Sequence, residues 1–129
     1  MTQNPQANTV LIVDDENTFT DALREVLQES GLSVSIAHDG VEALRSLETN
    51  PSSVVITDLN MPEMGGVELI KEARSRGLSS DFVICTGYPS EMTQREVKQL
   101  EVARYFTKPV KLEELMTAVR DLVSEHKSG

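Results

Sequence analysis

Five short apolar runs alternate with helical patterns along this chain, and this alternation limits the folds available to it. The runs Thr9–Val13, Val54–Thr57 and Phe82–Thr86 lack a regular polar alternation, as expected for strands that are covered on both faces. The runs Val34–Ala37 and Tyr105–Thr107 are shorter and half polar, which is typical of edge strands. Repeated strand–helix units predict a parallel sheet with helices on both faces, joined by right-handed crossovers.

Helical patterns separate these runs. Residues 19–27 place apolar side chains on one stripe before Gly31, residues 41–48 and 67–76 form shorter predicted helices, and residues 112–123 follow the helical repeat without a gap. Gly77 is expected to end the third of these helices. Five such units favour an α/β, flavodoxin-like (βα)5 fold, a three-layer sandwich whose parallel sheet has the strand order 2-1-3-4-5.

The segment Ser90–Leu100 is also predicted to be helical, but its apolar residues are few: Met92, Val97 and Leu100. A weakly anchored helix beside a chemical site is a candidate moving part. A helix that is merely solvated would have the same pattern, and the sequence leaves both interpretations open.

The length of 129 residues accommodates one domain. Residues 1–8 are polar and are expected to form a disordered N-terminal segment, with the folded domain over residues 9–126. The net charge of −9 disfavours direct binding to nucleic acid or to an anionic membrane. Cys85 is the single cysteine, residues 1–8 do not resemble a signal peptide, and no apolar run approaches the ~20 residues of a membrane span. We therefore expect a cytoplasmic protein.

Polar residues that could act as nucleophiles, metal ligands or counter-charges follow four of the predicted strands. They are Asp14, Asp15 and Glu16, then Asp58, then Thr86 and Gly87, and finally Lys108 and Pro109. Any one aspartate after a strand is most simply a turn or cap residue, and Asn17 is a plausible cap for the first helix. The carboxyl ends of parallel strands meet at one edge, however, so these side chains are expected to converge there.

Converging carboxylates require positive charge, because two like charges ~5 Å apart repel by roughly 3 kcal/mol at an effective dielectric near 20. Lys108 offers one counter-charge, and a divalent cation would supply the rest. Mg²⁺ accepts two carboxylates and a carbonyl while keeping several waters, with Mn²⁺ as an alternative. The predicted direct ligands are Asp15, Asp58 and the carbonyl of Asn60, and Asp14 would hold a coordinated water. Neither His38 nor His126 joins this group, which argues against zinc.

Phosphoryl transfer is the chemistry that fits these residues. Asp58 suits the nucleophile, Lys108 would contact one phosphoryl oxygen as a point charge, and the Thr86 hydroxyl could donate to another. The loop after Asp58 contains Met61-Pro62 and Gly65-Gly66, which permit the backbone to approach a phosphate. Taken alone, these loop motifs are typical of an ordinary loop.

Several motifs together resemble the receiver domain of two-component response regulators. They are Asp14-Asp15, the run Thr57-Asp58-Leu59-Asn60-Met61-Pro62, Thr86-Gly87, and Tyr105-Phe106-Thr107-Lys108-Pro109. The resemblance covers the chain from Thr9 to about Val123, in the right order and spacing.

This resemblance implies a phosphoacceptor signalling domain rather than an enzyme with a separate substrate. It implies that Asp58 accepts a phosphoryl group from a sensor histidine kinase or a histidine phosphotransfer protein, and that Thr86 and Tyr105 act as a switch pair. The surface of the fourth helix, fifth strand and fifth helix would then be read by a downstream partner or an attached output domain, with homodimerisation on activation as a further option.

The sequence departs from the common family pattern at two positions. Gly65 stands where aspartate is frequent, and Tyr88 occupies the second position after Thr86, where its bulk would shield the phosphoryl group and slow self-dephosphorylation. Cys85 is expected to be a small core residue.

Two alternatives come from other classes. A magnesium-dependent aspartyl-phosphate phosphatase usually carries a second aspartate two positions after the nucleophile, where this chain has Asn60. A degenerate receiver would act only as a protein-binding module, although all the chemically needed residues are present here.

Overall fold

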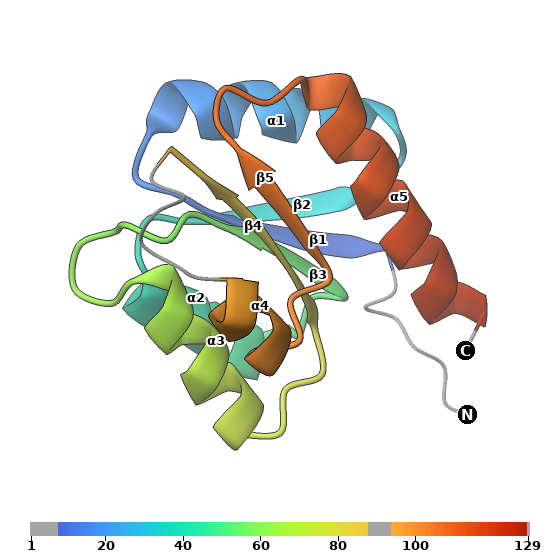
Figure 1. The fold of residues 1–129 in the computed structure, drawn as a ribbon. Coiled ribbons are helices and arrows are strands. Elements are labelled where there is room, and N and C mark those ends of the chain that lie inside the picture. The colour runs from blue at the N-terminus through green and yellow to red at the C-terminus, as the bar shows by residue number, and fades with distance from the viewer. Residues whose placement is uncertain (1–7, 88–93, 129) are drawn as a thin grey trace.

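The computed structural model describes residues 8–87 and 94–128, which form one parallel sheet flanked by helices (Figure 1). The strand order is β2-β1-β3-β4-β5, and all neighbouring strands pair in parallel, which confirms the predicted flavodoxin-like α/β topology. The elements in chain order are β1 (Thr9–Val13), α1 (Asn17–Glu29), β2 (Ser33–Ala37), α2 (Gly40–Thr49), β3 (Val54–Thr57), α3 (Gly66–Ser75), β4 (Asp81–Thr86), α4 (Gln94–Gln99), β5 (Arg104–Thr107) and α5 (Leu112–Ser128).

The sheet separates two hydrophobic cores, because successive strand side chains point to opposite faces. In β1, Val10 and Ile12 join the core beneath α1 and α5, whereas Leu11 and Val13 join the core beneath α2 and α3. Figure 1 shows α1 and α5 on one side of the sheet and α2, α3 and α4 on the other. The predicted three-layer sandwich is therefore present.

Burial along the strands matches their positions in the sheet. All residues of β3 are buried, and β4 is buried from Phe82 to Thr86. The edge strands β2 and β5 consist mostly of exposed or half-buried residues. A central strand has helices over both faces and neighbours on both sides, which is why its sequence is continuously apolar.

Glycines end two helices as predicted, but the start of α1 differs from the prediction. Gly31 and Gly77 adopt φ values of 91° and 77°, the left-handed region that glycine enters without strain. Asn17 is not the cap of α1, because Glu16 occupies the N-cap position without a side-chain cap hydrogen bond. The Asp14 carboxylate accepts the Glu16 N–H at 3.0 Å, and this local turn places Asn17 inside the first helical turn.

The described part of the predicted weakly anchored helix is α4. α4 spans six residues, Gln94–Gln99, and Val97 together with Leu100 packs only partly buried against the core beneath α2 and α3. Residues 88–93, which include Tyr88, Met92 and the predicted helix start at Ser90, lie outside the described residues. The role of α4 as a moving part stays a prediction.

The loop between β3 and α3 packs tightly against the backbone that carries Asp58. A Cβ atom at Gly66 would collide with the Asp58 carbonyl oxygen, and one at Gly65 would lie 2.8 Å from the Leu59 carbonyl oxygen. The Glu68 carboxylate accepts the Gly65 N–H at 3.2 Å at the start of α3. This loop therefore depends on glycine at both positions for the close approach of the two backbone segments.

Replacing Gly66 with alanine is expected to lower the free energy of unfolding by roughly 1–3 kcal/mol, because the new methyl group must displace the Asp58 backbone. Urea denaturation followed by circular dichroism measures this change. Gly87→Ala is the matched control, since a Cβ there meets nothing within 4 Å. Equal stability of the two variants would show that the loop is not tightly packed.

Candidate functional site

Backbone hydrogen bonds carry the strand pairing one residue beyond the strand ends and thereby fix the site. The Asp14 N–H donates to the Ala37 carbonyl at 3.1 Å, and the Asp58 N–H donates to the Val13 carbonyl at 3.1 Å. The Lys108 N–H donates to the Thr86 carbonyl at 2.8 Å. Asp14, Asp58 and Lys108 thus leave three different strands at the same edge of the sheet, as predicted.

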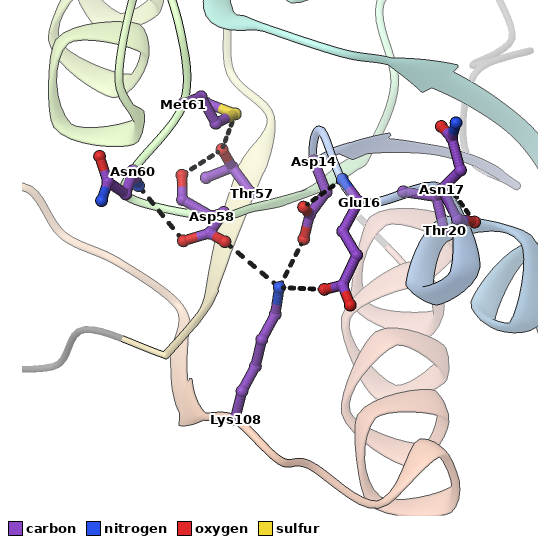
Figure 2. A network of polar contacts seen from close by, with 9 residues as sticks. All are labelled: Asp14, Glu16, Asn17, Thr20, Thr57, Asp58, Asn60, Met61 and Lys108. Carbon is purple, nitrogen blue, oxygen red and sulfur yellow. Dashed lines mark hydrogen bonds and ion pairs between the residues drawn. The ribbon is translucent and has the colours of Figure 1, made fainter.

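The ammonium group of Lys108 is the centre of the site. It donates to Asp14 Oδ2 at 2.7 Å and to Asp58 Oδ2 at 3.2 Å, and it lies 3.5 Å from Glu16 Oε1. Figure 2 shows these carboxylates converging on the ammonium group from β1, β3 and the start of α1. The predicted counter-charge is therefore placed directly between the two buried aspartates.

Asp14 is the more deeply buried of these aspartates, with 2% of its surface exposed. Burial raises the pKa of its carboxyl group, although hydrogen bonds from the Lys108 ammonium and the Glu16 N–H act in the opposite direction. Burial alone would lower the pKa of Lys108, but its hydrogen bond to Asp14 and the charges of Asp14 and Asp58 raise it above its ordinary value. Lys108 is thus held in its charged form at neutral pH.

Asp58 is 7% exposed and is oriented by its own loop. Its Oδ1 accepts the Asn60 N–H at 3.2 Å, while its Oδ2 faces Lys108. The buried Thr57 hydroxyl donates to the Asp58 carbonyl at 2.9 Å (Figure 2). Both carboxylate oxygens therefore have a donor, and the side chain points into the cleft with little freedom to turn away.

The cleft above these residues has a volume of about 510 Å³ and is lined by the predicted acidic set. Asp15, which is exposed, and Asn60 border it together with Asp14, Asp58 and Lys108. Glu16, Met61, Pro62 and Gly87 complete the lining.

The donor atoms in this cleft suit a hard cation. Within residues 8–87 and 94–128, no three His, Cys, Asp or Glu side chains form a group that could hold a metal ion by themselves. Mg²⁺ needs fewer, since it binds through one or two carboxylates and a carbonyl and keeps waters for the remaining positions. Oxygen donors from Asp15, Asp58 and Asn60 on one cleft fit this requirement, and the metal site stays a prediction.

The predicted switch residues lie on the side of the sheet that faces α2, α3 and α4. Thr86 is fully buried at the end of β4, and Tyr105 packs half-buried against the core on that side. In the β4–β5 register, Tyr105 pairs with Ile84, two residues before Thr86. Because alternate strand residues share a face, Thr86 and Tyr105 lie on the same side of the sheet.

Two contacts of Lys108 were not predicted, although Glu16 was expected at this edge of the sheet. Glu16 pairs with Lys108 at 3.5 Å, and the Lys108 Nζ lies 4.6 Å from the centre of the Phe19 ring. The sequence pattern places Phe19 only on the apolar stripe of the first helix. The spacing of Glu16 and Phe19 indicates that both side chains lie on the same side of the helix start, because residues three apart are neighbours on a helix surface.

The pH dependence of stability provides a test of the burial of Asp14. Because its pKa is raised above the ordinary 3.8, the folded state binds the proton more tightly than the unfolded state, so ionisation of Asp14 lowers stability as pH rises. Asp14→Asn lacks this titration. The stability of Asp14→Asn relative to the wild type is therefore expected to increase as pH rises through 3.8 to the raised pKa, and then to stay constant. Urea denaturation midpoints in metal-free buffer, with Asp121→Asn as the charge-matched control, measure this difference; a decrease with pH would contradict it.

The fold and the cleft define a class: an α/β domain with carboxylates and a lysine at the carboxyl edge of a parallel sheet. The chain matches the family model for the response regulator receiver domain over residues 10–120. Response regulator MprA of Mycobacterium avium (strain 104) is 32% identical over 118 residues, which cover 92% of this chain and 52% of that protein. The chain therefore belongs to the response regulator receiver domain family, as its sequence motifs indicated.

Solved structures agree with this assignment. The receiver domain of the Francisella response regulator 1452 has a TM-score of 0.85 and 28% identity, with 92% of this chain and 98% of that chain covered. A CheY-like receiver domain protein from Methanospirillum hungatei JF-1 has a TM-score of 0.84 and 25% identity, with coverage of 95% and 98%. The chain spans about half the length of the curated relatives that it matches. No helix among the described residues is both long and apolar enough to span a bilayer.

Proposed function

We propose that this receiver domain accepts a phosphoryl group on Asp58 in a magnesium-dependent reaction. The observation that carries the proposal is the pairing of Lys108 with both Asp58 and Asp14, at 3.2 and 2.7 Å, on the floor of an open acidic cleft. Asp58 lies beside the Lys108 ammonium group, and this positive charge can neutralise the oxygens of a phosphoryl group during transfer.

The reaction forms one bond and breaks one. An Asp58 carboxylate oxygen attacks phosphorus, the bond from phosphorus to the donor's leaving atom breaks, and the leaving group departs with that electron pair. Lys108 would neutralise one phosphoryl oxygen, and the N–H groups that line the cleft could donate to another. A divalent cation held by Asp15, Asp58 and the Asn60 carbonyl would stabilise the remaining negative charge.

The proposed signal is a shift between two conformations. Phosphorylation adds negative charge and acceptor oxygens, toward which the Thr86 hydroxyl would move. Tyr105 would fill the vacated space, because the two residues lie on the same face of the sheet. The partners proposed from the family are a sensor histidine kinase or histidine phosphotransfer protein as donor, and a downstream protein or attached output domain as recipient. A cytoplasmic location and the option of homodimerisation stay predictions.

The function is tested by incubating the chain with acetyl phosphate and Mg²⁺ and measuring its intact mass. We expect one base-labile phosphoryl adduct, mapped by peptide analysis to Asp58, and no adduct in EDTA. Stoichiometric modification supports a phosphoacceptor, whereas continuous hydrolysis of varied phosphoesters would favour the phosphatase alternative. Absence of any adduct with both Mg²⁺ and Mn²⁺ would contradict the proposal.

A further inference from the structure

Two side chains at the start of α1, those of the N-cap residue Glu16 and of Phe19, lie close to the Lys108 ammonium group. Glu16 Oε1 lies 3.5 Å from Nζ, and the centre of the Phe19 ring lies 4.6 Å from it. A ring face at this distance attracts a cation through its quadrupole, in addition to the ordinary attraction of the carboxylate. Asp14 and Asp58 contact the same ammonium group from β1 and β3.

Lys108 needs such contacts because it is a long, flexible side chain at the end of an edge strand. An ammonium group on a four-carbon stem is a point charge with many accessible rotamers. Its position relative to Asp58 sets how well it can neutralise a phosphoryl oxygen, since misplacement of a charge weakens transition-state stabilisation. Asp14 and Asp58 hold the ammonium group from two strands, and Glu16 and Phe19 at the start of α1 add two further contacts.

Glu16 and Lys108 also form the wall between two clefts. Both residues border the acidic cleft, and both border a second cleft of about 490 Å³ that is lined by Phe19, Ala22 and residues that follow Lys108. Phe19 is half-buried at this second cleft and packs against the core beneath α1. Its ring is therefore packed in place close to the ammonium group.

We propose that Glu16 and Phe19 are positioning residues that hold the Lys108 ammonium group between Asp14 and Asp58. For Phe19 the essential property is the aromatic face, and for Glu16 it is the negative charge. The consequence for phosphorylation rests on the function proposed above, whereas the effect on Lys108 itself does not.

The test measures Lys108 directly, by its rate of acetylation with an N-hydroxysuccinimide ester, quantified by peptide mass spectrometry. Lys71, Lys98 and Lys111 in the same molecule serve as internal references. Glu16→Gln and Phe19→Met are each expected to raise the relative acetylation rate of Lys108 about two- to fivefold, because an ion pair or a cation–π contact is lost. Phe19→Trp retains an aromatic face and is expected to keep the wild-type rate.

The matched control variants make the same kinds of substitution at residues that do not contact the Lys108 ammonium group. Glu25→Gln removes one negative charge from an exposed position on α1, and Phe106→Met replaces a ring that packs on the same core as Phe19. Neither should alter the relative rate at Lys108. Unchanged acetylation in Glu16→Gln and Phe19→Met, or an equal rise in Phe19→Met and Phe19→Trp, would overturn the proposal.

A second readout separates this inference from the proposed function. With acetyl phosphate, Phe19→Met is expected to form the Asp58 adduct about two- to fivefold more slowly, and Phe19→Trp at the wild-type rate. Wild-type protein that never forms an adduct, combined with faster Lys108 acetylation in the variants, would refute the function and leave the positioning role intact. A normal wild-type adduct with unchanged acetylation would refute only the positioning role.

Discussion

Asp58→Ala is expected to abolish the phosphoryl adduct that forms with acetyl phosphate and Mg²⁺. The other carboxylates of the cleft are poor substitutes. Asp14 is 2% exposed and engaged with Lys108 and the Glu16 N–H, and Asp15 lies at the exposed rim. A nucleophile must reach phosphorus in line with the leaving group, so a carboxylate at another angle does not take over the reaction.

The measurement is intact mass after a fixed incubation, together with peptide mapping. Asp121→Ala, an exposed aspartate on α5, is the control and should be modified like the wild type. Asp58→Ala should still fold, because Lys108 keeps its 2.7 Å contact with Asp14. An adduct of wild-type yield in Asp58→Ala would transfer the acceptor role to another residue and contradict the site assignment.

Lys108→Met is expected to have two effects of different kinds. The rate of adduct formation should fall by roughly 10²- to 10³-fold, the usual effect of removing one preorganised group that stabilises developing negative charge. Stability should also fall, because Asp14 loses its counter-charge while remaining buried. Removal of one partner of a buried pair costs about 3–5 kcal/mol, and the 18% exposure of the Lys108 side chain places the expected loss toward or below the lower end.

Two comparisons separate these effects. The double variant Lys108→Met/Asp14→Asn should recover stability without recovering the phosphorylation rate, because it removes the unpaired charge but restores no cation. Mg²⁺ should raise the urea midpoint of Lys108→Met more than that of the wild type, since a bound cation offsets the same negative charge. Lys111→Met is the control for loss of a nearby lysine. Wild-type phosphorylation in Lys108→Met would remove Lys108 from the mechanism.

The sequence was informative about the fold because burial and strand position impose a visible pattern. β1, β3 and β4 are covered on both faces and therefore have continuous apolar runs, while β2 and β5 lie at the edges and are half polar. Gly31 and Gly77 were recognisable as helix ends because a positive φ strongly favours glycine. The residue at which α1 begins was not predictable. The Asp14 side chain accepts the Glu16 N–H and forms a turn, so the helix begins directly after Glu16 and Asn17 is not its cap.

The placement of the candidate site residues could also be predicted, for one geometric reason. Parallel strands place the residues that follow them at one edge, so the sequence predicts that Asp14, Asp58 and Lys108 meet there. The contacts of Glu16 and Phe19 with Lys108 were harder to predict. Their spacing indicates that they share a side of the helix start, but nothing in a helical stripe indicates which of its members will face a cation that lies about ninety residues away in the sequence.

The two-sided core and the edge at which the acidic residues gather follow from local periodicity and from the parallel pairing of the strands. The strand order was expected because five strand–helix units suit the flavodoxin-like fold. The balance of the charges depends on contacts between distant parts of the chain. The crowding of carboxylates implied a positive partner, and the three-dimensional arrangement placed the Lys108 ammonium group between two of them, because a side chain's final position depends on every neighbour that packs around it.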